Sequence, residues 1–213
     1  MNWHEKYRAI LARLTSSSSV LENSVDGITN ALKVIDHQHH EIHSGDSFTA
    51  YYSRVTANGN GLRSGIYIKT PAAPKYIHMV VSFSCSTAAS YSICEAPTIA
   101  SNVGSHGNTI YNRLRDSTNP SGVFDNATVP AVGKYTTLTE AQIAADGTFN
   151  AGTVIRSEPL VAGSGPKPAG GNSRGEQEYI LKANTKYIFL LTNTTEDANI
   201  HHILIDWYSH ITS

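Results

Sequence analysis

The chain has 213 residues, a formal net charge of −1, 15% charged residues and 16 glycines. A chain of this length suits one domain with a hydrophobic core, and the low charged fraction, offset by Ser, Thr, Asn and Gly, is typical of a β-rich protein with many turns. The near-neutral charge and the scattered Lys and Arg residues argue against a nucleic-acid partner, which would need clustered basic side chains.

The N-terminal stretch MNWHEKYRAILARL contains no uninterrupted apolar core, so we expect no secretory signal. No apolar run approaches the ~18 residues that would span a bilayer. We therefore expect a protein that is made and folded in a cytoplasm and has no membrane partner. Cys85 and Cys94 should then be free thiols, although a hairpin centred on Ala89-Ser90 would bring them face to face.

Residues 1–36 differ from the rest and predict an N-terminal helical arm. Asn2 followed by Glu5 resembles a helix-capping pair, and the apolar residues that follow alternate in spacing as a coiled-coil seam requires. The run Thr15–Ser19 and Gly27 are poor helix formers, so two short amphipathic helices joined by a serine linker are the alternative. Isoleucines at seam positions favour a coiled coil of three helices over one of two. We predict a homotrimer assembled through Leu11, Leu14, Leu21, Val25, Ile28, Leu32 and Ile35.

Residues 37–213 predict an all-β domain, an antiparallel β-sandwich or jelly roll. From Phe48 onward the pattern has the period of two that strands show, and about eight to ten strands are expected with no convincing helix between them. The segments KYIHMVVSFSC and SYSICEAPT predict a strand pair, and Ala183-Asn184 predicts a tight turn. The glycine-rich stretch GSGPKPAGGNSRGE lacks the spacing of a phosphate-binding loop.

A cluster of histidines precedes the first strand: His37, His39, His40 and His43. If this stretch is extended, His37, His39 and His43 share one face with Glu41. Two imidazoles two positions apart can bind zinc when a third ligand comes from elsewhere, and His201 or His202 could supply it. Same-face positions over such a stretch span about 20 Å, however, so they cannot all reach one ion.

We favour a structural role for these histidines, as hydrogen-bonding groups where the arm joins the sheet. The sequence shows no nucleophile with an orienting base and no Gly-x-Ser-x-Gly elbow. We therefore predict a protein that is not an enzyme and has no catalytic residue, no cofactor and no required metal.

The stretch HHEIHSGDSF (39–48) resembles a motif of virion structural proteins from tailed bacteriophages, in which a His-His-Glu-Ile-His-x-Gly segment opens the β domain. The motif residues here are His39, His40, Glu41, His43 and Gly45. Further elements of that pattern are matched, in order, by Thr70-Pro71, YIHM (76–79), GGNSRGEQEYIL (170–181), Leu181–Tyr187 and Trp207-Tyr208. The resemblance covers Ile35 to the C-terminus and implies a structural component of the virion.

The resemblance leaves the place in the particle open. A head decoration or cement protein that binds the major capsid protein or other virion proteins is the first hypothesis, because such binding needs a large, mostly polar contact area. A tail, baseplate or fibre component that binds host glycan is the second, with five candidate stacking residues unless they are buried in strands: Tyr51, Tyr52, Tyr67, Tyr111 and Tyr135. An unrelated cytosolic binding module or sandwich-fold enzyme is the third.

Overall fold

The computed structural model describes residues 37–161, 167–168 and 178–211, without the side chains of 37–39, 167–168 and 211. Contacts between residues group Glu41–Ser213 into one compact unit, which contains the β-sandwich. The predicted arm and its candidate oligomerisation residues, from Leu11 to Ile35, lie outside the described residues.

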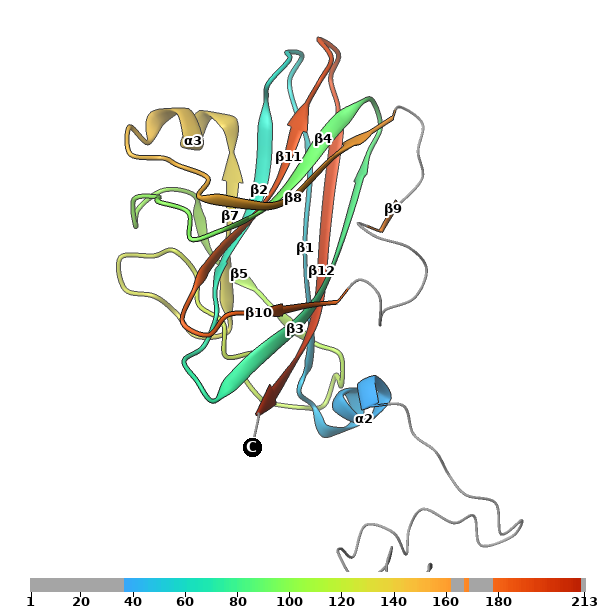
Figure 1. The fold of residues 1–213 in the computed structure, drawn as a ribbon, viewed down its shortest axis with the longest axis vertical. Helices are drawn as coiled ribbons and strands as arrows, with labels where there is room; N and C mark the ends of the chain where they lie inside the picture. The colour runs from blue at the N-terminus through green and yellow to red at the C-terminus, as the bar shows by residue number, and fades with distance from the viewer. Residues whose placement is uncertain (1–36, 162–166, 169–177, 212–213) are drawn as a thin grey trace, which may run out of the picture. The chain divides into compact units, whose positions relative to one another are not determined.

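The regular structure of the described part of the chain is mostly β-strand (Figure 1). Its elements, in chain order, are α2 (His37–Ser44), β1 (Ser47–Val55), β2 (Arg63–Lys69), β3 (Lys75–Cys85), β4 (Ala89–Glu95), β5 (Ser105–Thr109), β6 (Tyr111–Asn112), β7 (Lys134–Thr139), α3 (Glu140–Ala145), β8 (Thr153–Leu160), β9 (Lys167–Pro168), β10 (Tyr179–Leu181), β11 (Lys186–Asn193) and β12 (Ile200–Ile211).

The strands form two antiparallel sheets, which confirms the predicted all-β sandwich. The first sheet has the order β10-β3-β12-β1-β6, with β9 also on β3, and the second has the order β5-β7-β2-β11-β4-β8. The strands pair as in one long hairpin that is rolled up on itself: β1 with β12, β2 with β11, β3 with β10 and β4 with β8. This pairing is the jelly roll, in which β1, β2, β3 and β4 alternate between the two sheets, as β10, β11 and β12 do.

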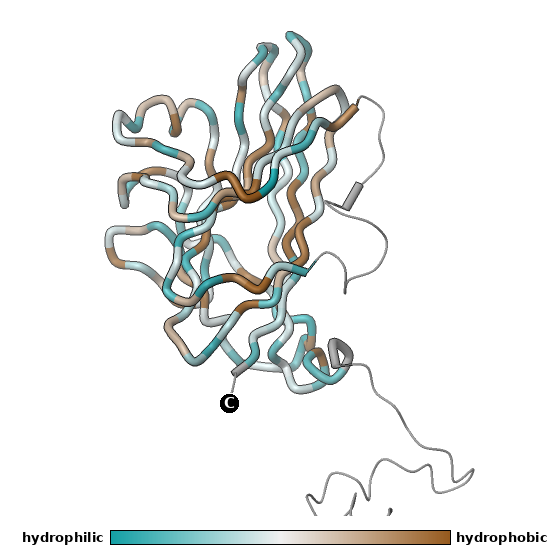
Figure 2. Tube along the Cα trace, viewed as in Figure 1, coloured by the Kyte–Doolittle hydropathy of each residue, from teal (hydrophilic) through white to brown (hydrophobic). Residues whose placement is uncertain are grey.

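The main core lies between the sheets and follows from the alternation of side chains along each strand. In β3 every second residue from Ile77 to Cys85 is buried, and β12 alternates in the same way from His201 to Trp207. Figure 2 shows the most hydrophobic stretches along the strands. Each large apolar side chain buried in this way stabilises the fold by roughly 1.5–3 kcal/mol.

The long connection between β4 and β8 adds to both sheets and covers one of them. Its strands β5 and β7 extend the second sheet beyond β2, while the short β6 pairs with the start of β1. Residues of the connection, with α3, pack on the outer face of the second sheet and make a second hydrophobic cluster, whose buried members are Tyr67, Cys94, Ile99, Leu138, Ile143, Ile188 and Leu190.

The predicted pairing of β3 with β4 is wrong. Residues 86–88 lead from the first sheet to the second, where β4 pairs with β11 and β8. Cys85 lies in the main core and Cys94 in the second cluster, and both are free thiols. A short Ser/Thr-rich link between two alternating segments has the same appearance whether it closes a hairpin or crosses between sheets, because the burial pattern of each strand is unchanged.

The expectation of no helix between the strands is also wrong, since α3 lies between β7 and β8. Thr139 caps it: its hydroxyl accepts from the backbone N of Gln142, and the Gln142 side chain accepts from the backbone N of Thr139. The sequence Thr-Glu-Ala-Gln carries this reciprocal capping signature. Strand β7, with the sequence KYTTLT, was not predicted either, although its β-branched and aromatic residues favour a strand.

The histidine stretch is helical, so the extended arrangement considered for zinc does not occur. Helix α2 ends in a Schellman motif: the backbone N of Gly45 donates to Ile42 O at 3.1 Å, and that of Asp46 donates to Glu41 O at 3.0 Å. Gly45 has a φ of +80°, and a Cβ at this position would lie 2.4 Å from Ser117 Oγ. The backbone therefore requires glycine at the end of the His-His-Glu-Ile-His-x-Gly segment.

We predict that Gly45→Ala lowers the free energy of unfolding by more than Gly61→Ala, a matched control. Both glycines have φ near +80°, so both substitutions carry the strain of the left-handed region, about 1 kcal/mol. Only Gly45 lies against a neighbour, because no atom lies within 4 Å of a Cβ at Gly61. Urea unfolding measures the difference, and equal losses in the two variants would contradict this account of the helix end.

Candidate functional site

Three connections meet at one end of the sandwich around the buried side chain of Asn199. Its Oδ1 accepts from the backbone N of Ser86 and of Thr87, both at 3.0 Å. Its Nδ2 donates to Thr87 O and Ala88 O, both at 3.3 Å, and to Asn193 Oδ1 at 2.6 Å. One amide thus holds the β3–β4 connection against the β11–β12 connection. It is the partner of the Thr87 backbone N–H and C=O, whereas Ser86 N also donates to Ile200 O and Ala88 O also accepts from Thr194 N.

The β1–β2 connection joins the same cluster through Thr56 and Asn193. The hydroxyl of Thr56 donates to Asn199 O and accepts from its backbone N, both at 3.1 Å. Asn193 Nδ2 donates to Gly59 O at 3.2 Å and to Asp197 O at 3.1 Å. Thr56, Asn193 and Asn199 are all buried, so the cluster is an internal support for the loops and not a surface open to ligands.

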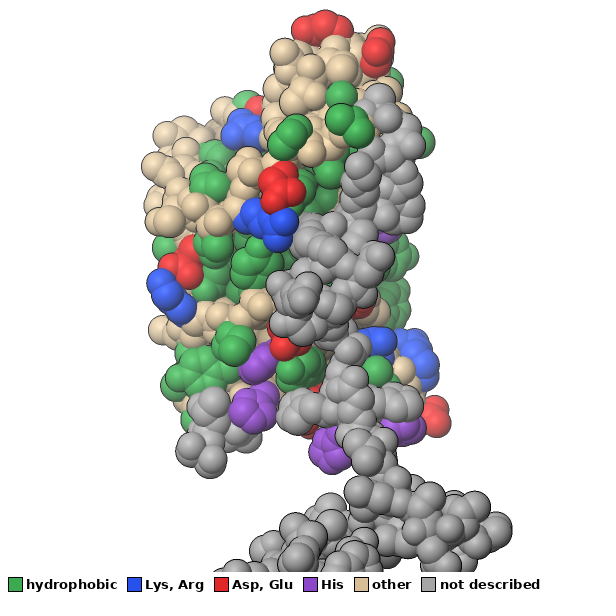
Figure 3. All heavy atoms as spheres, turned by 45° about the vertical axis from the view of Figure 1, so that its right-hand side comes forward, with side chains coloured by type: hydrophobic (Ala, Val, Ile, Leu, Met, Phe, Trp, Pro, Cys, Tyr) green, Lys and Arg blue, Asp and Glu red, His purple; other side chains and the backbone are tan. Residues whose placement is uncertain are grey.

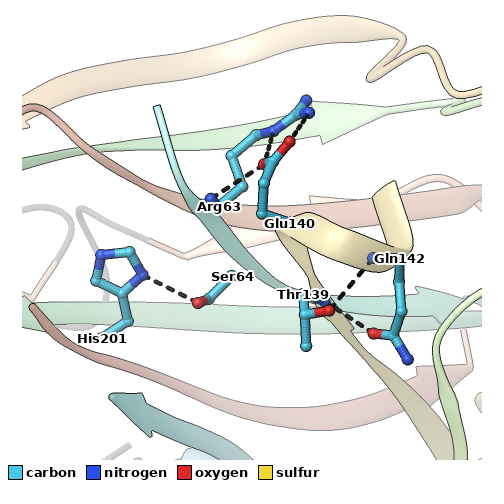
Figure 4. A network of polar contacts seen from close by, with 6 residues as sticks. All are labelled: Arg63, Ser64, Thr139, Glu140, Gln142 and His201. Carbon is cyan, nitrogen blue, oxygen red and sulfur yellow. Dashed lines mark hydrogen bonds and ion pairs between the residues drawn. The ribbon is translucent and has the colours of Figure 1, made fainter. Parts of the chain in front are cut away.

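His201 extends this cluster into the sandwich, in an arrangement that resembles a nucleophile, a base and an orienting group. Its Nδ1 lies 3.0 Å from Ser64 Oγ and its Nε2 lies 3.4 Å from Asn193 Oδ1 (Figure 4). Ser64 and Asn193 are 0% exposed and His201 is 1% exposed. Burial, and secondarily the positive charge of Arg54, lowers the pKa of His201 to about 4.

These values argue against catalysis at His201. No substrate can reach Ser64 through a closed core, and an imidazole with so low a pKa is a poor general base at neutral pH. The neutral ring donates from Nε2 to Asn193 and accepts at Nδ1 from the Ser64 hydroxyl, so its role is to satisfy polar groups inside the sandwich.

An ion pair beside this cluster fixes α3 to the second sheet. The guanidinium of Arg63 binds Glu140 through two hydrogen bonds, Nε to Oε2 at 2.6 Å and Nη2 to Oε1 at 2.7 Å (Figure 4). The hydrogen bond to Glu140 raises the pKa of Arg63, and the guanidinium also lies 5.3 Å from the ring centroid of Phe149. The guanidinium and the carboxylate bind each other, so this pair has a structural role.

Of the five segments that follow the histidine stretch in the phage resemblance, three have residues that lie next to one another in the first sheet. His78 of β3 pairs with Ile180 of β10 on one side and Tyr208 of β12 on the other. The rings of His78 and Tyr208 stack with centroids 4.7 Å apart, and the Tyr208 hydroxyl donates to Glu178 Oε2 at 3.1 Å. Figure 3 shows histidine side chains gathered toward this end of the molecule.

The other two segments of the resemblance meet at the β2–β3 and β10–β11 connections. The Thr70 hydroxyl donates to Lys182 O at 2.6 Å and accepts from the backbone N of Thr185 at 2.8 Å. Asn184, between them, has a φ of 50° and donates its backbone N–H to Pro71 O at 2.7 Å. The predicted turn at Ala183-Asn184 is thereby confirmed.

The candidate zinc ligands whose side chains are described form no metal-binding cluster. His40, Glu41 and His43 lie in the last turns of α2, while the side chain of His39 lies outside the described part. His201 points into the core, and its neighbour His202 lies on the opposite face with its ring centroid 6.4 Å from that of Tyr51. Among the described residues, no three His, Cys, Asp or Glu side chains lie close enough to hold an ion.

Four of the five candidate stacking tyrosines line one hollow, which is the open candidate site of the described chain. Its volume is about 320 Å³, and its lining consists of Tyr51, Tyr52, Ser53, Asn108, Thr109, Tyr111, Tyr135 and Thr137. Tyr51 is 50% exposed and Tyr111 is 39% exposed. The fifth tyrosine, Tyr67, is buried in the second cluster, so for that residue the alternative of a buried strand tyrosine holds, as it does for the ring of Tyr135.

Tyr135 supports the floor of this hollow. Its ring is buried, and its hydroxyl donates to Tyr51 O at 2.6 Å, which links β7 of the second sheet to β1 of the first. Burial raises the pKa of Tyr135 to about 12, so the hydroxyl keeps its proton at physiological pH. Asn108 Nδ2 donates to Ser105 O and to Tyr135 O, which leaves its carbonyl oxygen as the group available to a ligand.

The chain matches no protein-family model, no curated protein and no solved structure. No helix in the described ranges is long and apolar enough to cross a membrane.

We predict that His201 makes the protein sensitive to mild acid. The unfolded chain binds a proton on this residue near pH 6.5, whereas the folded chain does so only near pH 4. The stabilisation is therefore complete above pH 6.5 and is lost as the pH falls toward 4, by up to about 3 kcal/mol at 1.36 kcal/mol per pKa unit. Urea unfolding at about pH 7 and about pH 5 measures this loss.

Carboxylates such as Glu95 and Glu158, whose pKa values are lowered by Lys182 and Arg156 respectively, add their own acid dependence. The comparison is therefore made against His201→Gln, which should be less stable at neutral pH but should lose less on acidification. His202→Gln is the control, and its free energy of unfolding should fall on acidification by as much as that of the wild type. An equal acid loss in wild type and His201→Gln would refute the assignment.

Proposed function

We propose that this protein is a non-enzymatic structural component of a tailed-bacteriophage virion, with a head decoration or cement protein as the first candidate. The observation that carries the proposal is the convergence of the resemblance segments. The elements around His78, Ile180 and Tyr208 occupy adjacent strands, and those around Thr70 and Asn184 share hydrogen bonds. Elements scattered along the chain therefore act as connected structural units, which supports a resemblance based on their order.

A non-enzymatic role is supported by the state of the polar groups. The Ser64–His201–Asn193 arrangement is buried, and the Arg63–Glu140 pair is satisfied internally. A protein of this kind acts through its surface, as a cement protein does when it covers a junction between capsid subunits. Such contacts rely on extended, mostly polar area.

The edge strand β8 is the part of the second sheet best suited to contact a capsid partner. It pairs with β4 on one side, and no other named strand pairs with it among the described residues. Val154 is 54% exposed and Ile155 is 43% exposed. An exposed edge with apolar side chains is a template for strand addition by another chain, so we assign the contact with the major capsid protein to this edge.

A tail, baseplate or fibre component is the second candidate, and the tyrosine-lined hollow favours it. Exposed aromatic rings next to polar side chains are suited to sugar rings, whose C–H faces pack on aromatic surfaces. A display protein at the tail would use such a site to bind host glycan.

We predict that purified particles of a phage encoding this chain contain it in a number comparable with the major capsid protein, on the order of hundreds per particle, because a cement protein covers repeated junctions. Quantitative mass spectrometry of purified particles measures the ratio. A handful of copies would overturn the head assignment in favour of the tail, and absence from particles would overturn the virion proposal.

The contact surface has a matched test. Particles stripped of the protein should rebind the wild type and a Val129→Asp variant, because Val129 is an exposed valine of the β4–β8 connection. A Val154→Asp, Ile155→Asp double variant should rebind at least about tenfold more weakly, since charges would replace apolar contacts at the edge. Equal rebinding of both variants would remove β8 from the interface.

A further inference from the structure

The tyrosine-lined hollow continues into a second one. The second has a volume of about 280 Å³ and shares Thr109 and Tyr111 with the first. It is lined further by polar loop residues that include Asn112, Ser117 and Asn119. The two hollows therefore adjoin at Thr109 and Tyr111, and together they are called the groove.

The groove is rich in hydrogen-bonding side chains and poor in charge. None of the described residues that line the first hollow is charged at neutral pH, and Ser53, Asn108 and Thr137 supply hydroxyl and amide groups. The second hollow has one charged group, Arg115, whose guanidinium lies 5.3 Å from the ring centroid of Tyr111. Arg115 also donates to Asn112 O at 3.3 Å, so it is already engaged within the protein.

The position of Arg115 decides which side of Tyr111 a ligand can use. A guanidinium that lies over a ring occupies one of its two faces. The other face remains for a ligand, and because Tyr51 is exposed on the same side of the groove a flat, weakly polar ring would contact both tyrosines. Hydroxyl groups around that ring would meet the Asn108 carbonyl oxygen and the Thr109 and Thr137 hydroxyls.

We propose that this groove binds a neutral oligosaccharide of at least two sugar units, one in each hollow, with Tyr111 at the linkage between them. A sugar ring carries apolar C–H faces for the tyrosines and a rim of hydroxyls for the amide and hydroxyl groups, which is the combination that the groove presents. Its two hollows are each near the lower limit of small-molecule sites, a size suited to a single sugar unit. A phosphate-bearing ligand would need positive side chains in the lining, and the one ammonium beside the first hollow among the described hydrogen bonds, that of Lys134, already donates to Thr109 Oγ1 at 3.3 Å.

A protein strand added to the free edge of β1 is the main competing occupant, and the geometry disfavours it. The edge beyond β6 presents the backbone groups of alternate residues, as the bond from Arg113 N to Ser47 O at 2.9 Å shows. Along this edge, Tyr51 O is the second such carbonyl oxygen after Ser47 O. It already accepts from the Tyr135 hydroxyl at 2.6 Å, so an incoming strand would lose a ladder bond at the centre of the edge.

This inference names a ligand class for the second proposed function, a glycan-binding tail component. It rests on that proposed function only for the biological purpose of sugar binding. Sugar binding is a property of the isolated chain, whereas the place in the virion is set by copy number. Failure of either measurement leaves the other intact.

The test is saturation-transfer NMR and calorimetric titration of the full chain with maltose, cellobiose, lactose and diacetylchitobiose, and with sialyllactose as an acidic probe. We expect at least one neutral disaccharide to bind with a dissociation constant on the order of 1 mM. Tyr111→Phe should bind within about threefold of the wild type, because the ring is kept, and Tyr111→Ala should bind at least about tenfold more weakly.

Tyr76→Ala, on the outer face of β3, is the matched control and should leave binding unchanged; circular dichroism verifies that each variant is folded. Absence of binding to every neutral sugar at about 20 mM would overturn the proposal. So would binding that survives in Tyr51→Ala, Tyr111→Ala, which would place the sugar elsewhere. Binding of sialyllactose alone, abolished by Arg115→Gln, would overturn the assignment of a neutral ligand.

Discussion

The buried amide of Asn199 is the constraint on which the arrangement of the sandwich depends. A jelly roll crosses repeatedly between its two sheets, so its connecting loops carry backbone groups that no strand can satisfy. Burying such groups unpaired costs about 1–3 kcal/mol each. Asn199 satisfies those of the β3–β4 connection and, through Asn193 and Thr56, holds the β1–β2 and β11–β12 connections. Three crossings at this end, β1–β2, β3–β4 and β11–β12, therefore close on one polar cluster.

This closure positions the strands that form the groove. β1 leaves the cluster at Thr56, and its register with β12 is continuous from Ser47 to Val55. The β4–β8 connection then supplies β5, β6 and β7, which bring Tyr111 beside Thr49 of β1, two residues from Tyr51, and Tyr135 against the Tyr51 backbone. The Tyr135 hydroxyl bridges the two sheets at this point. The open surface of the groove is thus built on a rigid frame, which suits a binding site because little ordering is needed when the ligand arrives.

The sequence predicted the fold class well because alternation is a local signal. The buried positions of β3 from Ile77 to Cys85 are legible without a structure, and so is the turn at Asn184, where a left-handed φ favours Asn. Strand partners were not legible, because pairing of β3 with β10 and β12 is decided by contacts far apart in sequence. The expected β3–β4 hairpin failed for this reason.

At the candidate site, too, local features could be predicted from the sequence and contacts between distant residues could not. The tyrosines were recognised as possible stacking residues, but only the fold separates the exposed rings of Tyr51 and Tyr111 from buried Tyr67. The His40–Gly45 segment suggested ligand chemistry, whereas its glycine is explained by the Schellman motif at the end of α2. The Ser64–His201 contact had no sequence signal, since its partners lie 137 residues apart.

The most direct test of this account is the free energy of unfolding of Asn199→Ala, measured by urea denaturation against Asn102→Ala, an exposed asparagine on the β4–β8 connection. We predict that Asn199→Ala loses about 3 kcal/mol or more, because the backbone N–H and C=O of Thr87 and the buried side chain of Asn193 lose a partner together, and that Asn102→Ala stays within about 0.5 kcal/mol of the wild type. A loss below about 1 kcal/mol for Asn199→Ala would contradict the claim that this amide holds the sandwich end together.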